Sequence, residues 1–499
     1  MTVKAQRGPA LLLAALVLWA NSAIAAEPDL GKRVRQHTLK NGIRVLLIER
    51  HLSPTVACYI RHRVGAVDEE DGRTGMAHLL EHMMFKGTKT IGAINYEGEK
   101  RLIEKITAAG KALDRELMKG TRGNAGNIER LSAQLKELQA RHKRWFRSGE
   151  IDRLYTENGG VDSNASTGQD LTTYHVSLPR DKIELWARIE SDRMRHPVFR
   201  EFYTERDVVL EERRQRIESD PEGTLFERFF AAAFAAHPYR RPVLGWPSDI
   251  QFLDPDDMMS FFQRHHAPDN TVITIVGDLQ PRVVMKIIER HFGSIPRKGS
   301  HYKRVTDEVP EKGERRIEVL FKANPELILG YRKPAPPAFD DYVFDIIDFI
   351  LSKGRTSRLY KVLVEDKKLA ESVWTANGMP GARYPNLFVV FASPRHPHTA
   401  GEVEASIAEE MEKLKREAVG SRELDKVKNR IRADYIRGLD SNDGLAGDLS
   451  YYESILGDWR YFTTHVDIIE KITAEDIMRV AQKYLLKENC TVAVLKQPS

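Results

Sequence analysis

The chain has 499 residues, of which 41% are hydrophobic and 30% are charged, and its formal net charge is +5. This length exceeds what one hydrophobic core usually supports, so two or more domains are expected, and the balanced composition excludes a fibrous or disordered protein. So small a positive charge gives no indication of a nucleic-acid partner.

The first residues are typical of a secretory signal peptide. Lys4 and Arg7 precede the apolar stretch "ALLLAALVLWA", and the small-residue sequence "AIA" ends just before Ala26. This pattern predicts a cleaved signal peptide over residues 1–25 and a mature protein that is periplasmic or secreted. An uncleaved anchor is the alternative. No later stretch is long enough for a stable membrane span.

The chain has only two cysteines, Cys58 and Cys490, which lie in expected strands at opposite ends of the sequence. We therefore expect two buried free thiols rather than a disulfide. A cysteine-rich zinc site is excluded.

The first part of the chain mixes strands and helices. The segment "NGIRVLLIERHLSPTVACYIRHRVGAVDE" predicts strands at 43–50 and 55–64, separated by a Ser-Pro turn. Apolar periodicity predicts later helices at 182–195 and 203–218, and a helix that follows a strand at 271–276 and runs to about His291.

Residues 98–146 are strongly charged and contain two helical stretches separated by "GTRGNAGN". Each stretch has apolar residues on one side, which predicts a helical hairpin inserted into the first half of the chain. The basic and aromatic "RHKRWF" at 141–146 is interpreted as a solvated helix face, with nucleic-acid binding as the weaker alternative.

A polar stretch broken by Pro and Gly predicts a linker at 291–313, after which the order of elements restarts. The strands "RIEVLFK" and "ELILGYR" precede a helix, "YVFDIIDFILSKGRTSRLYKVL". Aligning its "SKG" with the "FKG" of 85–87 places Asp345 and Phe349 where the first half has His78 and His82. We interpret this as a duplication into an N-terminal half at 32–290 and an inactive C-terminal half at 314–499. Two unrelated amphipathic helices are the alternative.

The stretch "GMAHLLEHMMFKGT" at 75–88 carries two histidines and a glutamate in an apolar helix. His78 and His82 are four residues apart and project from the same helix face. Two imidazoles suit zinc, and Glu81 lies close enough to take a proton from a water at an open position. This H-x-x-E-H pattern inverts the commoner H-E-x-x-H motif. Two core histidines bonded to the main chain, with Glu81 as an ordinary helix charge, are the alternative.

A third ligand should come from another element. Glu205 and Glu212 are two helical turns apart in the predicted helix at 203–218. By itself such a carboxylate stripe is interpreted as a solvated helix face.

The segments "GMAHLLEHMMFKGT", "VDSNAST", "ERDVVLEERR" and "HPYRRPVLGWPSDI", in this order, resemble the pitrilysin/insulinase family of zinc peptidases, or inverzincins. The resemblance covers most of the chain after the signal, and the chain resembles the two-repeat, processing-peptidase-like bacterial subunits of that family. It implies an α+β fold of two homologous α/β-roll halves, each a mixed or antiparallel sheet covered by helices.

The resemblance also implies site residues. His78, His82 and Glu212 would hold one zinc ion per chain, Glu81 would be the general base, and Glu205 would be a supporting carboxylate.

Asn164 and Ala165, in "VDSNAST", would belong to an edge strand to which an extended peptide adds itself. Without the resemblance, Asn164 would be interpreted as a turn residue.

Two features depart from the family pattern. The separation of His82 from Glu212 is longer than usual and coincides with the predicted hairpin, which we interpret as a gate or docking arm. The family often uses an Arg and a Tyr of the inactive repeat to hold the substrate carbonyl, and these positions are Val364 and Glu371 here. The resemblance therefore implies a heterodimer whose related partner lacks HxxEH and supplies that pair, with a homodimer as the alternative.

The expected function is hydrolysis of internal peptide bonds in short or unfolded polypeptides by a zinc-activated water. The alternatives are a non-catalytic peptide-binding or structural subunit of the same fold, and a periplasmic zinc-binding protein. His265 and His266 are expected to be surface residues rather than ligands.

Overall fold

The computed structural model describes residues 30–297, 299, 304–310 and 312–498. The predicted signal peptide at 1–25 and part of the predicted linker at 291–313 lie outside these residues. None of the described helices is long and apolar enough to cross a membrane.

The first sheet is mixed and has six strands in the order β1-β2-β6-β3-β5-β4. Strands β2 and β6 are parallel, and every other neighbouring pair is antiparallel. The strands are β1 (Arg35–Thr38), β2 (Arg44–Glu49), β3 (Thr55–His62), β4 (Val161–Thr167), β5 (Thr172–Pro179) and β6 (Thr271–Gly277). Since β2, β3 and β6 are rich in β-branched residues and have both faces buried, their near-continuous apolar runs were readable in the sequence.

The second sheet has five strands in the order β7-β11-β8-β10-β9. Each of these strands occupies the same position as the strand of the first sheet whose number is five lower. The only parallel pair of the second sheet, β7 with β11, therefore corresponds to β2 with β6. The strands are β7 (Arg315–Leu320), β8 (Glu326–Lys333), β9 (Ala370–Met379), β10 (Asn386–Pro394) and β11 (Cys490–Lys496). The expected α+β fold of two homologous halves with mixed sheets is confirmed.

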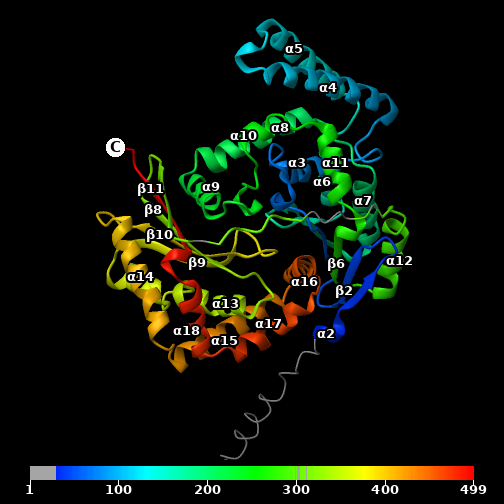
Figure 1. Ribbon diagram of the computed structural model, residues 1–499. Coiled ribbons are helices and arrows are strands. Elements are labelled where there is room, and N and C mark those ends of the chain that lie inside the picture. Colours follow the sequence, from blue (N-terminus) through cyan, green and yellow to red (C-terminus); the bar gives the residue numbers. More distant parts are fainter. Residues whose placement is uncertain (1–29, 298, 300–303, 311, 499) are drawn as a thin grey trace, which may run out of the picture.

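Helices cover both sheets (Figure 1). Those before the linker are α2 (Leu30–Arg33), α3 (Met76–Met84), α4 (Tyr96–Leu117), α5 (Ala125–His142), α6 (Glu150–Glu157), α7 (Ile183–Arg195), α8 (Phe202–Arg213), α9 (Pro221–Ala233), α10 (Pro247–Ile250), α11 (Pro255–His265) and α12 (Pro281–Phe292). Those after it are α13 (Phe339–Ser352), α14 (Ala400–Arg416), α15 (Ser421–Gly438), α16 (Asn442–Leu456), α17 (Arg460–Lys471) and α18 (Ala474–Tyr484).

Each half lends one helix to the sheet of the other half (Figure 1). Helix α9 packs on β7, β8 and β11, where Phe229 lies so close to Gly330 that a Cβ there would be 2.4 Å from its ring. Helix α16 packs on β3 and β6 through buried residues such as Leu445 and Leu449. Because both contacts bury apolar surface, separating the halves would expose core side chains of each.

The predicted hairpin consists of α4 and α5, which pack against each other and project from the body at the top of Figure 1. Buried ion pairs near both ends of α4 fix the hairpin to the segment around α8. Glu99 of α4 accepts from Arg200 and pairs with His142 of α5, and Asp114 of α4 pairs with Arg206 of α8.

Two predicted helices are shorter than expected. The helix expected over "YVFDIIDFILSKGRTSRLYKVL" ends at Ser352, because Gly354 has a φ of +94° that takes the chain out of the helix, and a separate π-helical segment follows at Tyr360–Asp366. The helix expected at 203–218 is α-helical only to Arg213 and continues as a π-helical segment at Arg214–Glu218.

The expectation that His265 and His266 lie at the surface is wrong for His266. Its side chain is 3% exposed and packs on His62, with 4.0 Å between the ring centroids. The cause is the end of α11, which turns His266 inward beneath β3. Cys58 and Cys490 are both buried and free, as expected.

Candidate active site

Helix α3 is held in place at its first turn. Gly75 precedes the helix with a φ of +85°, and a Cβ there would lie 2.7 Å from the carbonyl oxygen of Leu244. The carboxylate of Glu69 accepts hydrogen bonds from the main-chain N–H groups of Gly75 (2.9 Å) and Ala77 (2.8 Å). A carboxylate suits the positive end of a helix, so Glu69 fixes the start of the segment that carries the histidines.

The structure brings His78, His82 and Glu212 together. One potential ligand atom from each lies within 4.8 Å of the other two. Oε2 of Glu212 is 3.7 Å from Nε2 of His78 and 3.5 Å from Nε2 of His82. Helix α8 packs on α3, which places the stripe expected as a solvated face against the histidines.

These donors fit a zinc ion. Burial, helped by the neighbouring charges of His82 and Arg216, lowers the pKa of His78 to about 3, so its imidazole is neutral, as a ligand must be. Two imidazole nitrogens and one carboxylate oxygen form a three-residue set of the kind that leaves a fourth position for water or substrate.

Glu205 lies behind the ligands. Its Oε2 is 3.3 Å from Nδ1 of His82, and its other oxygen pairs with Lys86. Burial opposes ionisation of Glu205, but these two hydrogen bonds hold its pKa below the usual range. Because Nδ1 of His82 faces a carboxylate, Nε2 is the nitrogen turned toward Glu212, which is the orienting arrangement expected of a supporting residue. Arg216 steadies Glu212 from the outer side at 3.2 Å.

Glu81 faces the same space and is bonded to the end of β4. The hydroxyl of Thr167 donates to Oε2 of Glu81 at 2.5 Å, while burial raises the pKa of this carboxyl. Thr167, Lys86 and Glu69 were missed in the sequence. Thr167 ends the quoted "VDSNAST" segment and Lys86 follows the HxxEH helix directly, but only the fold shows their contacts.

Asn164 and Ala165 lie in β4, the edge strand next to the site. They pair with His175 and Tyr174 of β5, and the other edge of β4 has no strand partner among the described residues. Asn164 is exposed, and its side chain accepts a hydrogen bond from the N–H of Ala165. An unpaired edge is a template for an extended peptide.

Val364 and Glu371 are the positions at which the resemblance led us to expect an Arg and a Tyr. Val364 packs against the core of the second half, and Glu371 is exposed on β9. Neither side chain can donate a hydrogen bond to an oxyanion.

Comparison with known families supports the motif analysis. The model described as Insulinase (Peptidase family M16) matches residues 44–114 and 146–246, and the one described as Peptidase M16 inactive domain matches residues 253–431. Together they cover more than half of the chain, which belongs to the insulinase family of peptidases. The first model leaves out residues 115–145, which contain α5 and the hairpin turn.

Named relatives are zinc proteases. The chain is 27% identical over 468 residues to zinc protease PqqE of Helicobacter pylori, with 92% of each chain covered. It is 22% identical over 467 residues to the uncharacterized zinc protease YmxG of Bacillus subtilis, covering 93% of this chain and 98% of that one. These relatives support a peptidase that uses zinc.

Solved structures share the fold. A protease from Helicobacter pylori aligns with a TM-score of 0.77 at 26% identity, covering 93% of this chain and 99% of that one. A peptidase M16 inactive domain from Pseudomonas fluorescens aligns with a TM-score of 0.73 at 16% identity, covering 93% and 98%. The first half of the periplasmic protease PqqL from Escherichia coli aligns with a TM-score of 0.69 at 17% identity, covering 93% and 92%, and this chain covers 48% of the whole PqqL chain.

Proposed function

We propose that this protein is the metal-bearing subunit of a zinc endopeptidase that cleaves short or unfolded polypeptides. The observation that carries the proposal is the convergence of His78, His82 and Glu212, in which one oxygen of Glu212 lies within 3.7 Å of both histidine nitrogens. Family membership and the relatives named zinc proteases support it.

His78, His82 and Glu212 would hold the ion. When bound, zinc polarises the scissile carbonyl and lowers the pKa of water, which supplies a nucleophile at neutral pH. Thr167 occupies Oε2 of Glu81, so Oε1 is the atom that accepts the proton of the attacking water. Glu81 then returns that proton to the leaving amine. Glu205 holds the ring of His82 in the orientation that presents Nε2.

The substrate would add itself to β4 as an extended strand. Asn164 and Ala165 offer main-chain groups along the exposed edge, and Thr167 ends the same strand at the general base. Main-chain pairing tolerates many side chains but requires an extended segment, so unfolded polypeptides are the expected substrate class.

The oxyanion would be held by a partner chain. Because Val364 and Glu371 replace the Arg and Tyr, this chain by itself should be a weak peptidase. This chain matches the first half of PqqL and covers 48% of the whole PqqL chain, which supports a second unit beside this one. The proposed assembly is a heterodimer with a related subunit that lacks HxxEH, and a homodimer is the other arrangement. The sequence pattern at residues 1–25 supports export to the periplasm or beyond.

The test compares zinc content and hydrolysis of a quenched fluorescent peptide for three proteins, each with and without the candidate partner. The wild type should bind one zinc ion and cleave best with the partner. Glu81→Gln should keep zinc and lose turnover by about 10²- to 10⁴-fold. Glu212→Gln should lose both the zinc ion and turnover. A wild type that binds zinc and cleaves nothing with any partner would identify a zinc-binding protein, and one without zinc would identify a structural or peptide-binding subunit.

A further inference from the structure

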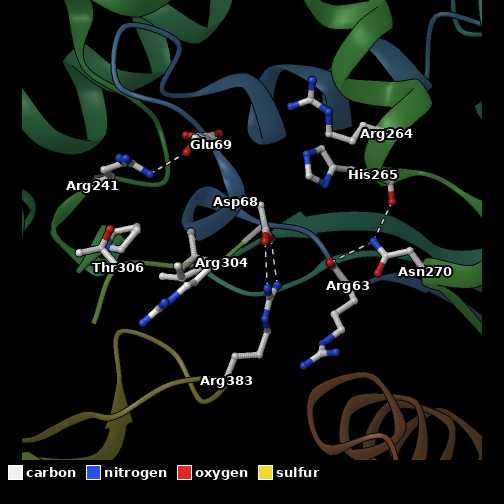
Figure 2. A pocket seen from close by; sticks show the side chains of 13 residues that line it. Arg63, Asp68, Glu69, Arg241, Arg264, His265, Asn270, Arg304, Thr306 and Arg383 are labelled. Carbon is white, nitrogen blue, oxygen red and sulfur yellow. Dashed lines mark hydrogen bonds and ion pairs between the residues drawn. The ribbon is translucent and has the colours of Figure 1, made fainter. Parts of the chain in front are cut away.

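A cavity outside the metal site lies between the two halves and is dominated by arginines (Figure 2). Its volume is about 180 Å³, room for several waters. Guanidinium groups line it from three parts of the chain: Arg63, Arg241 and Arg264 from the first half, Arg304 from the segment between the halves, and Arg383 from the β9–β10 connection.

The acidic residues that line this arginine pocket do not balance its charge. Asp68 is held at two points by Arg383, with both N–O distances at 2.9 Å. Glu69 directs both carboxylate oxygens to the N–H groups at the start of α3. Asp68 and Glu69 are the only lining carboxylates among the described residues, so five guanidinium groups face one paired carboxylate and one that is turned away.

Carboxylates around the pocket contact two of its arginines. Arg241 binds Asp71 and the main-chain oxygen of Glu69, and Arg264 lies 3.7 Å from Glu70 at a half-exposed position. A net positive cavity of this size, lined by planar guanidinium groups, favours a carboxylate or phosphate, which these groups bind at two points.

The pocket adjoins the strand on which the peptide would lie. The connection that follows β4 is bonded directly to pocket residues: Gln169 donates to the main-chain oxygen of Arg241 (2.7 Å), and Arg383 donates to the main-chain oxygen of Asp170 (3.1 Å). Gln169 is two residues beyond Thr167, the residue bonded to Glu81. Two residues of chain span at most about 7 Å, so the pocket is within reach of residues close to a scissile bond at Glu81.

We propose that the arginine pocket binds a carboxylate of the peptide substrate, near the bond to be cleaved, and so gives the protein a preference for acidic peptides. This inference rests on the proposed function, since it assigns the pocket to the substrate of the same site. A free carboxylate at the end of a peptide and the side chain of an internal Asp or Glu share the chemistry that the pocket recognises.

The test measures binding separately from cleavage. Zinc-loaded Glu81→Gln protein is titrated with a labelled peptide containing Asp and Glu, and with its twin containing Asn and Gln. We expect the acidic peptide to bind about tenfold more tightly, and 0.5 M salt to reduce the difference. Adding both Arg63→Gln and Arg264→Gln to this protein should abolish the difference in affinity between the two peptides. The matched control is Arg290→Gln, which removes an exposed charge on α12 outside the pocket lining and should leave the difference unchanged. Amidated peptides show whether a chain end or an internal side chain is the bound carboxylate.

The same preference should appear in kcat/KM of the wild type. Equal binding of the two peptides to Glu81→Gln, or a difference that survives the double substitution, would overturn the inference. The inference would also be overturned if neither peptide were preferred and inorganic phosphate bound to the wild type but not to the double variant. Absence of cleavage refutes the proposed function only, because the binding titration still decides what the pocket recognises.

Discussion

Arg206 and Asp114 form a buried two-point ion pair, with Nη1 to Oδ2 at 2.8 Å and Nη2 to Oδ1 at 3.0 Å. Arg206 belongs to α8, between Glu205 and Glu212, and Asp114 belongs to α4 of the hairpin. The hairpin thus packs on the ligand helix α8 and supports it through this pair.

Replacing Asp114 with Ala should destabilise the protein. The substitution leaves the guanidinium of Arg206 buried without its carboxylate, and breaking one partner of a buried pair costs about 3–5 kcal/mol. Urea unfolding followed by circular dichroism measures the change. The control is Glu137→Ala, which removes an exposed partner of Arg141 at 3.9 Å and should change stability by less than about 0.5 kcal/mol. Equal midpoints for the two variants would contradict the supporting role of the pair.

Gly110→Ala should also be destabilising, although alanine usually favours a helix by about 1 kcal/mol. A Cβ at Gly110 would lie 2.0 Å from Cζ of Tyr203, a buried residue in the first turn of α8. The clash would push α4 away from α8, at a cost of about 1–3 kcal/mol. Gly126→Ala in α5 is the matched control, because the nearest atom to its Cβ is 3.4 Å away. A Gly110→Ala protein as stable as Gly126→Ala would show that the two helices are not in close contact.

Thr167→Val should lower kcat of the active assembly. The valine keeps the shape of the side chain but removes the hydrogen bond that fixes Oε2 of Glu81, and a hydrogen bond to a charged group is worth about 1.5–3 kcal/mol, or about 10- to 100-fold in rate. Zinc content should stay the same. Thr167→Ser, which keeps the hydroxyl, should retain most of the activity. Steady-state kinetics with a fluorogenic peptide makes the comparison, and the prediction is wrong if the serine variant is as slow as the valine variant.

Stability should fall as the pH is lowered from 7 to 5. Burial, with the nearby charge of Arg193, lowers the pKa of His62 to about 3, and burial beside His62 lowers the pKa of His266 well below its usual value. The unfolded chain therefore binds protons from about pH 6.5 downward while the native state does not, so stability decreases by about 2 kcal/mol per histidine between pH 7 and 5.

Urea midpoints at the two pH values measure this decrease. His266→Phe removes one of the buried histidines whose pKa is lowered and should show a smaller difference between pH 7 and pH 5 than the wild type. The same midpoint for the wild type at both pH values would show that the histidines are solvated or already charged in the native state.

The sequence alone was enough to predict the central strands of the first sheet, several helices and the metal motif. Strands β2, β3 and β6 were legible because their apolar, β-branched runs are buried on both faces. The spacing of His78 and His82 places them on one helix face whatever the rest of the chain does, since it depends only on the helical repeat. The family motifs together supported the assignment to the insulinase peptidases more strongly than any single pattern did.

Only the tertiary structure decided which of those groups meet. The glutamates of α8 form an ordinary acidic stripe in the sequence, and Glu212 faces the histidines only because α8 packs on α3. The bond from Thr167 to Glu81, the exchange of α9 and α16 between the halves, and the gathering of five arginines into one cavity join residues far apart in the chain. Periodicity and spacing act within one element, whereas contacts between elements depend on how the two sheets and their helices pack, and no local pattern encodes that packing.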